Sequence, residues 1–282
     1  MLVIDDVAYC AAGRSSFLDG GIQLCRIDVA TGELLTESTV EHYDDETGRQ
    51  PAAELFSMEG ALPDVLLFDG EAVCTRHLRF HMKTLEALPA KPHLFTPTGF
   101  LDDSWWHRSY WVYAPAFNAG WGGWWQVGNK APSGRILSIS NDKVYGFGRS
   151  FYPSRNAGQW NEGEAYQLFS VSKQPSGASI NQRHVKNSSQ PKYNWQKKTQ
   201  VNARAIAVAG KMVFFAGPLG DINHDLDAFN ARKGTKLIAL ASTDGKQLSE
   251  LDLPADPVFD GMAVTQGRLY ISLKNGQVIA LR

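Results

Sequence analysis

A repeated β-hairpin pattern constrains the fold of this chain more than any other feature of its sequence. Five segments each combine a short apolar strand, a tight polar turn and a second apolar strand. They are residues 2–13 (LVIDDVAYCAAG), 65–76 (VLLFDGEAVCTR), 136–148 (ILSISNDKVYGFG), 207–217 (AVAGKMVFFAG) and 263–273 (AVTQGRLYISL). The turns are Asp5-Asp6, Asp69-Gly70, Asn141-Asp142, Gly210 and Gln266-Gly267, which are residue types that tolerate the positive φ of a hairpin. The pattern predicts five β-hairpins.

Each hairpin is followed by a further alternating strand, which in two units continues through a Thr-Gly or Asp-Gly turn into another strand. These strands lie within residues 22–35, 78–85, 166–172, 235–248 and 276–281. Four strands per unit are typical of a propeller blade, and no segment has a sustained apolar period of 3.6 residues. We therefore predict a nearly helix-free, all-β chain. Its fold is a β-propeller with about five recognisable four-stranded blades in a single domain, residues 1–282.

The last unit ends after its third strand, and the chain begins directly in the first strand of the first unit. Two interpretations remain open. The chain is an incomplete ring or fragment whose missing part belongs to a longer chain, or its last blade has three strands and an edge that an insertion or a second subunit covers.

The hairpins start farther apart than the ~40–50 residues of a minimal blade, so the loops contain insertions. The most unusual is residues 99–134, a Trp-rich insertion that holds six of the eight tryptophans. Aromatic faces next to charged side chains suit a glycan surface, whereas large aromatic residues also pack inside proteins. Both interpretations stay open. The ligand-binding candidates are Trp105, Trp106, Trp121, Trp124, Trp125 and Asp102, together with Arg14 and Asp19 in another loop.

The same insertion offers candidates for acid–base catalysis. His107, Arg108 and Tyr110 lie beside Asp102 and Asp103, and could serve uronate elimination or glycoside cleavage. Adjacent carboxylates point to opposite sides of a strand, so the pair more readily supplies a turn cap or an ion pair. Catalysis is thus the alternative to binding, and the expectation leans towards no enzyme.

Two segments have the spacing of metal ligands. Asp221, Asn223, Asp225 and Asp227 alternate as in the opening of a calcium loop, but the glycine and the final glutamate of an EF-hand are missing. Calcium is therefore kept as an option beside a solvated acidic loop. Cys74, His77 and His81 are spaced like zinc ligands, but Cys74 occupies the repeat position of Cys10, which predicts core thiols.

Charge and composition exclude several classes of protein. Lys plus Arg number 28 and Asp plus Glu 29, so charge excess does not predict a nucleic-acid binder. The basic stretch around Lys186 and Lys198, which includes Tyr193 and Trp195, is interpreted as a flexible loop. No apolar run approaches the ~18 residues of a membrane helix, so membrane insertion is not expected. Three cysteines are too few for a disulfide scaffold, and phosphate-loop, dinucleotide and nucleophile-elbow motifs are missing from the sequence.

Several blocks of the sequence resemble a known family. Residues 13–35, 93–124, 134–149 and 230–281 are similar to the pyrroloquinoline-quinone (PQQ)-like β-propeller repeats, of the quinoprotein dehydrogenase-like superfamily, in large secreted proteins of planctomycete-type bacteria. The resemblance implies a propeller and a periplasmic or secreted location. Quinone-using members have adjacent cysteines and a repeat-closing Trp. Both are missing here, so PQQ is not expected and no cofactor is predicted.

Taken together, these features predict a non-catalytic binding or scaffolding β-propeller whose partner is a glycan or a protein. The alternative is a carbohydrate-active enzyme, a polysaccharide lyase or hydrolase. A quinone-dependent dehydrogenase ranks behind both.

Overall fold

The computed structural model confirms that the chain is nearly all-β. The structure describes residues 1–42, 46–47, 64–96, 111–115, 131–150, 166–173, 191–221 and 225–282. Their regular structure is strand apart from α2, a helix of four residues at Leu226–Phe229. None of the helical structure within these ranges is long and apolar enough to cross a membrane.

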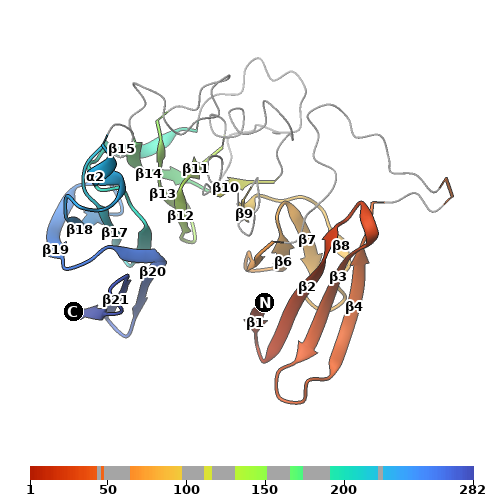
Figure 1. Cartoon of the computed structure of the whole chain (residues 1–282). Coiled ribbons are helices and arrows are strands. Elements are labelled where there is room, and N and C mark those ends of the chain that lie inside the picture. Colours follow the sequence, from red (N-terminus) through yellow and green to blue (C-terminus); the bar gives the residue numbers. More distant parts are fainter. Residues whose placement is uncertain are drawn as a thin grey trace. The chain divides into compact units, whose positions relative to one another are not determined.

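The strands form six antiparallel sheets, four with four strands and two with three (Figure 1). The first two sheets contain β1 (Leu2–Ile4), β2 (Val7–Ser15), β3 (Leu18–Asp28), β4 (Leu34–Val40), β5 (Leu66–Phe68), β6 (Ala72–Thr75), β7 (Leu78–His81) and β8 (Ala87–Leu88). Next along the chain come β9 (His93–Phe95), which pairs with β10 (Trp111–Ala114), and the two-residue β11 (Ser133–Gly134). The last three sheets contain β12 (Ile136–Ile139), β13 (Lys143–Arg149), β14 (Tyr166–Ser172), β15 (Tyr193–Lys198), β16 (Ala205–Ala209), β17 (Met212–Pro218), β18 (Thr235–Ala241), β19 (Gln247–Leu253), β20 (Pro257–Thr265), β21 (Arg268–Leu273) and β22 (Val278–Leu281).

In every four-stranded sheet the spatial order of the strands is their chain order, as in a propeller blade. The five predicted hairpins are all present. The chain divides into two compact units: unit 1 contains β1 to β9 and most of β10, and unit 2 contains β11 to β22.

The turn residues explain where the strands reverse. Asp5, Asp6, Gly70 and Gly210 all have positive φ, as the residue types at these turns predict. The turns between third and fourth strands follow one pattern in both units: Gly32 and Gly245 have φ values of 74° and 71°. Each of these two glycines donates its backbone N–H to a carbonyl four residues earlier. The predicted Thr-Gly and Asp-Gly turns are thus confirmed.

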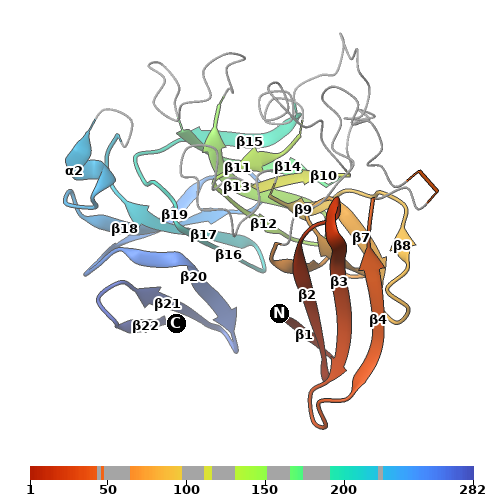
Figure 2. The same ribbon diagram turned by 45° about the vertical axis from the view of Figure 1, so that its right-hand side comes forward.

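Each unit has its own core between consecutive sheets. In unit 1, Tyr9, Ile22 and Leu24 of the first sheet pack with Val73 and Phe80 of the second. In unit 2 the β16–β19 sheet lies between the β12–β15 and β20–β22 sheets (Figure 2) and buries both of its faces.

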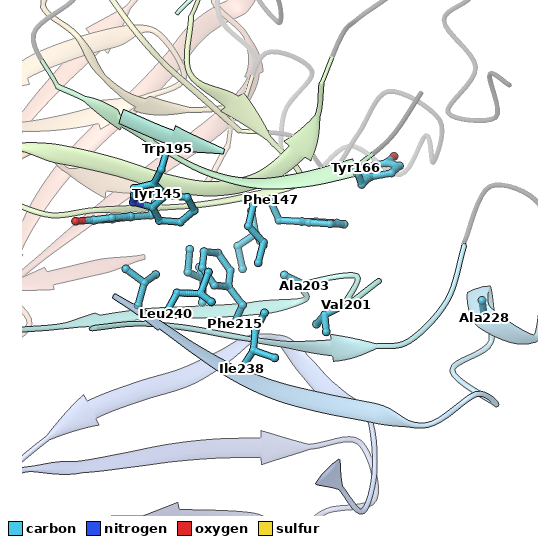
Figure 3. Packing of buried hydrophobic residues seen from close by; sticks show 14 residues of the cluster. Tyr145, Phe147, Tyr166, Trp195, Val201, Ala203, Phe215, Ala228, Ile238 and Leu240 are labelled. Carbon is cyan, nitrogen blue, oxygen red and sulfur yellow. The ribbon is translucent and has the colours of Figure 1, made fainter. Parts of the chain in front are cut away.

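Along β16 the two faces of the sheet carry side chains of different size, with Ile206 and Val208 on one face and Ala205 and Ala207 on the other. One face packs Phe215, Ile238 and Leu240 against aromatic residues of β13 and β15 (Figure 3). The other face presents Ala205 and Ala216, with other residues, to the β20–β22 sheet.

The structure differs from the sequence prediction in two places. A sixth sheet contains β9 and β10, whose strands are separated by residues 96–110. The basic stretch that was interpreted as a flexible loop includes β15, the outer strand of its sheet, and Trp195 in β15 is buried. The indole N–H of Trp195 donates to the carbonyl of Ser242, in the neighbouring sheet of the same unit. The buried ring thus anchors β15 against the neighbouring sheet. The last described sheet, β20–β22, has three strands, as predicted.

Gly217 in β17 allows the chain to pass closely over this strand. A Cβ atom on Gly217 would clash with the backbone carbonyl group of Asn202, which lies well inside van der Waals contact distance of that position. Replacing Gly217 by Ala is expected to lower the free energy of unfolding by ~1–3 kcal/mol, the usual range for overpacking a rigid core. Urea denaturation followed by circular dichroism measures the change. Gly267→Ala is the control: its Cβ would meet open space, so the cost is limited to backbone strain of ~1–2 kcal/mol at positive φ. A Gly217→Ala protein as stable as the wild type would contradict the expected crowding.

Candidate functional site

The candidate site lies at one edge of the sheets of unit 2. Because the strands of each sheet are antiparallel and follow one another in order, β12 and β14 begin at one edge of their sheet, and β16 and β18 begin at one edge of theirs. A hydrogen bond from the Asp260 N–H to the carbonyl of Arg204 joins β20 to the start of β16. Arg135, directly before β12, acts on the pKa of Arg204, directly before β16. The chain also leaves β13 and β17 at the edges where β14 and β18 begin. Figure 3 shows Tyr166, Val201 and Ala228 together at this end. We call it the loop edge of unit 2.

Two arginines occupy equivalent positions at the loop edge. Arg135 comes directly before β12, and Arg204 directly before β16. The backbone N–H of Arg135 donates to the carbonyl of Phe147 at 2.7 Å, and that of Arg204 donates to Ala216 at 2.8 Å. These hydrogen bonds to the neighbouring strand fix the backbone of each arginine in the same way. Both side chains therefore extend from a fixed backbone position at the start of a strand.

Asp256 is the acidic centre of this edge. Its carboxylate is buried and forms ion pairs with the guanidinium of Arg204 and, at 2.8 Å, with the ammonium of Lys274. The backbone N–H of Lys274 also donates to the Asp256 carbonyl at 2.8 Å. The second carboxylate oxygen, Oδ1, is buried and has no hydrogen-bond partner among the described atoms.

The basic side chains of this edge influence one another. Burial, and then the nearby Arg135, lower the pKa of Arg204. Burial, and then Arg204, lower the pKa of Lys274. Within the described part of the chain, the half-buried Arg135 has no carboxylate partner. We call Arg135, Arg204 and Lys274, with Asp256, the cationic cluster.

Asp260, in β20, lies next to this cluster along the chain. Its backbone N–H donates to the carbonyl of Arg204 at 2.8 Å, and its φ of 54° is in the left-handed region. Burial raises the pKa of its carboxyl group. Asp260 therefore adds a carboxyl group that holds its proton more tightly than usual.

Most of the ligand-binding and catalytic residues expected from the sequence lie outside the described residues. These are Asp102, Trp105, Trp106, His107, Arg108, Tyr110, Trp121, Trp124 and Trp125. Asp19 lies in β3, but its side chain is also outside the described part, and Arg14 is exposed in β2. Of the segment 99–134 the structure describes 111–115 and 131–134, which contribute β10 and β11. The single domain with an insertion stays a prediction.

The expected calcium ligands have other roles where they are described. Asp225 caps α2 by accepting from the N–H groups of Asp227 and Ala228, and it pairs with Lys233. Asp227 pairs with Arg232 at 3.2 Å. Asn223 lies outside the described residues, and Asp221 is exposed. Within the described ranges, three or more His, Cys, Asp or Glu side chains nowhere gather as a metal site.

The residues with zinc-like spacing do not converge either. Cys74 is buried, and burial raises the pKa of its thiol to about 12. The ring of His81 binds Thr84 in the adjacent turn. Cys74 is thus the core thiol that the repeat predicted, whereas Cys10, at the equivalent position, is only half-buried.

The cationic cluster was not among the residues singled out from the sequence. A signal for it exists in hindsight: Ser133-Gly134-Arg135-Ile136 and Asn202-Ala203-Arg204-Ala205 share the order polar, small, arginine, apolar before a first strand. The contribution of Asp256 and Lys274 has no such signal, because they approach Arg204 only through folding.

The fold and this site define an all-β protein of blade-like antiparallel sheets with a charged loop edge. No family model and no curated protein match the chain. Among solved structures it is similar to BamB from Moraxella catarrhalis, with a TM-score of 0.40 and 10% sequence identity over 99% of this chain and 67% of that chain.

Proposed function

We propose that this protein is a non-catalytic binding scaffold that engages an acidic segment of a protein partner at the loop edge of unit 2. The observation that carries the proposal is the cationic cluster, in which Arg204 and Lys274 pair with the buried carboxylate of Asp256 and Arg135 lies near Arg204. Arginine presents a planar fork of donors that matches a carboxylate, so a glutamate or aspartate of a partner is the complementary group.

Arg135 is the residue through which a partner would bind first. It is half-buried and without a carboxylate in the described part of the chain, whereas Arg204 and Lys274 already share Asp256. A partly desolvated guanidinium gains more from a carboxylate than an exposed one does, because the low local dielectric strengthens the interaction.

Two other buried arginines of the described residues, Arg79 and Arg149, make contacts within their own sheets. Arg79 pairs with Asp69 inside the second sheet, and Arg149 lies over the ring of Tyr166. These contacts connect neighbouring strands of one sheet and present no paired acid and base to a substrate.

A glycan partner is the second candidate, favoured by the six tryptophans in residues 99–134. On that hypothesis Trp105, Trp106, Trp121, Trp124 and Trp125 stack on sugars, with Asp102, Arg14 and Asp19 binding hydroxyl groups. If the glycan were also cleaved, His107, Arg108 and Tyr110 would be the catalytic candidates. We propose no cofactor, and the resemblance to secreted repeats supports a periplasmic or secreted location.

Replacing Arg135 by Ala is expected to weaken binding of a fluorescein-labelled polyglutamate peptide by ~10- to 100-fold, since one charged hydrogen-bonded pair contributes ~1.5–3 kcal/mol. Fluorescence anisotropy at low and high salt measures the dissociation constant. Arg268→Ala is the matched control, because Arg268 is an exposed arginine at the opposite edge of unit 2. Equal affinities of the two variants would contradict the proposed site.

Two further experiments separate the protein-binding proposal from the glycan-binding and enzyme hypotheses. Binding of polygalacturonate or neutral polysaccharide in preference to polyglutamate would favour the glycan hypothesis. Turnover of a polysaccharide that is abolished by His107→Ala, with circular dichroism unchanged, would replace the binding scaffold by an enzyme.

A further inference from the structure

Two of the three cysteines face each other across neighbouring strands of unit 1. Cys10 of β2 lies directly opposite Cys25 of β3 in the antiparallel register. The ladder around this pair is continuous, with Tyr9 opposite Arg26 on one side and Ala11 opposite Leu24 on the other. Residues directly opposite each other project to the same face of a sheet. The two thiols therefore share one face.

The distance between such positions suits a disulfide bond. Directly opposite residues in an antiparallel pair have Cα atoms ~4.5–5.5 Å apart, and disulfides span ~4.4–6.8 Å between Cα atoms. Burial, Glu37 and then Cys10 raise the pKa of the Cys25 thiol, which agrees with the two sulfur atoms being neighbours. Both cysteines are free and half-buried in this structure, so a small oxidant can approach them.

The flanking residues hold the two strands in place. The guanidinium of Arg26 lies 5.9 Å from the ring centre of Tyr9 and donates to the carbonyl of Lys83 at 2.8 Å. The Tyr9 hydroxyl donates to the carbonyl of Met82 at 3.1 Å. A cross-strand bond between the cysteines therefore needs rotation of their side chains rather than movement of the strands.

We propose that Cys10 and Cys25 are a redox-active pair that closes to an intramolecular disulfide in an oxidising compartment and ties β2 to β3. The oxidant is a disulfide donor such as oxidised glutathione. One cysteine thiolate attacks the donor disulfide and releases one donor thiol. The second cysteine thiolate then attacks the mixed disulfide, forms the Cys10–Cys25 bond and releases the second donor thiol. Two cysteine thiols are oxidised and one donor disulfide is reduced to two thiols.

Cys74 provides an internal control for this proposal. It is buried in β6, and its pKa of about 12 leaves almost no reactive thiolate. Cys74 is therefore expected to stay a thiol under conditions that oxidise the pair. The proposal is independent of the proposed binding function, because both cysteines belong to unit 1 and the cationic cluster belongs to unit 2.

The test equilibrates the full chain with mixtures of reduced and oxidised glutathione, followed by alkylation in denaturant and peptide mass spectrometry. We expect one alkylated thiol, Cys74, and a linked peptide pair containing Cys10 and Cys25. Reduction should restore three alkylated thiols. The melting temperature of the oxidised protein should exceed that of the reduced protein by ~5–10 °C, because the bond constrains the unfolded chain.

Variants make the outcome decisive. Cys74→Ser should still form the bond and show the shift in melting temperature, whereas Cys10→Ser and Cys25→Ser should lose both. Three free thiols at oxidising ratios, separate glutathione adducts on Cys10 and Cys25, or disulfide-linked dimers would each overturn the proposal. Polyglutamate binding by the Cys10→Ser variant shows separately whether the binding proposal holds.

Discussion

Lowering the pH from 7 to 4 is expected to destabilise unit 1 by about 3 kcal/mol through a single buried histidine. Burial, and then the neighbouring Arg76 and His93, lower the pKa of His77 from 6.5 to about 4. In the unfolded chain the ring takes up a proton near pH 6.5, so protons favour the unfolded state between these two values. The stability from neutral His77 is complete above about pH 6.5 and is lost as the pH falls towards 4.

The experiment compares urea denaturation of the wild type and of His77→Leu at several pH values. Leucine takes up no proton, so the variant should lack this part of the pH dependence. The ring Nδ1 of His77 is buried without a hydrogen-bond partner in the described structure, so replacing the ring leaves no hydrogen bond of this atom broken. His81→Gln, at an exposed histidine, is the control for replacing a histidine outside the core. A His77→Leu slope equal to that of the wild type would show that this ring is not the source.

Replacing Arg79 by Ala is expected to lower the free energy of unfolding by ~3–5 kcal/mol, because the carboxylate of Asp69 then remains as a buried charge without its ion-pair partner. The side chain of Arg79 is only 2% exposed and contacts Asp69 at 2.7 Å. It also donates to the carbonyl of Pro89 at 3.1 Å. Asp69 accepts the N–H groups of Glu71 and Ala72, so its carboxylate stays inside the turn when the arginine is gone.

Lys91→Ala is the matched control for this prediction. Lys91 pairs with Glu71 at 2.7 Å, but both side chains are more than half exposed. An exposed pair contributes at most ~1 kcal/mol. Urea denaturation should therefore show a clearly larger loss in the free energy of unfolding for Arg79→Ala than for Lys91→Ala. Similar losses for the two variants would mean that burial does not strengthen the contribution of Arg79 to stability.

The sequence predicted the hairpins because their turns need particular residues. Gly70 and Gly210 adopt backbone angles that few other residue types tolerate, and the apolar runs beside them fix the strands. The β9–β10 pair escaped prediction because no tight turn joins these strands. The segment around β15 was misread because its lysines dominate the composition, whereas the burial of Trp195 against another sheet depends on contacts distant in sequence.

The candidate site was harder to predict than the fold. Arg204, Asp256 and Lys274 are far apart in the sequence and meet only because β16 and β20 begin, and β21 ends, at one edge. A charged residue at a strand end is common, so its type alone indicates nothing about a partner. The tryptophans of residues 99–134 could be singled out from the sequence because six of the eight lie in one short segment, and such clustering is a local feature.

The unequal faces of the β16–β19 sheet give its positions opposite mutational tolerance. On the face with Phe215 and Leu240, truncation to a smaller residue opens a cavity, while modest apolar exchanges keep the volume. On the face with Ala205 and Ala216, both fully buried, little remains to truncate, and enlargement to valine forces the neighbouring sheet aside. A saturation library of β16 should therefore reject small residues at Ile206 and large residues at Ala205 and Ala207, alternating from one residue to the next.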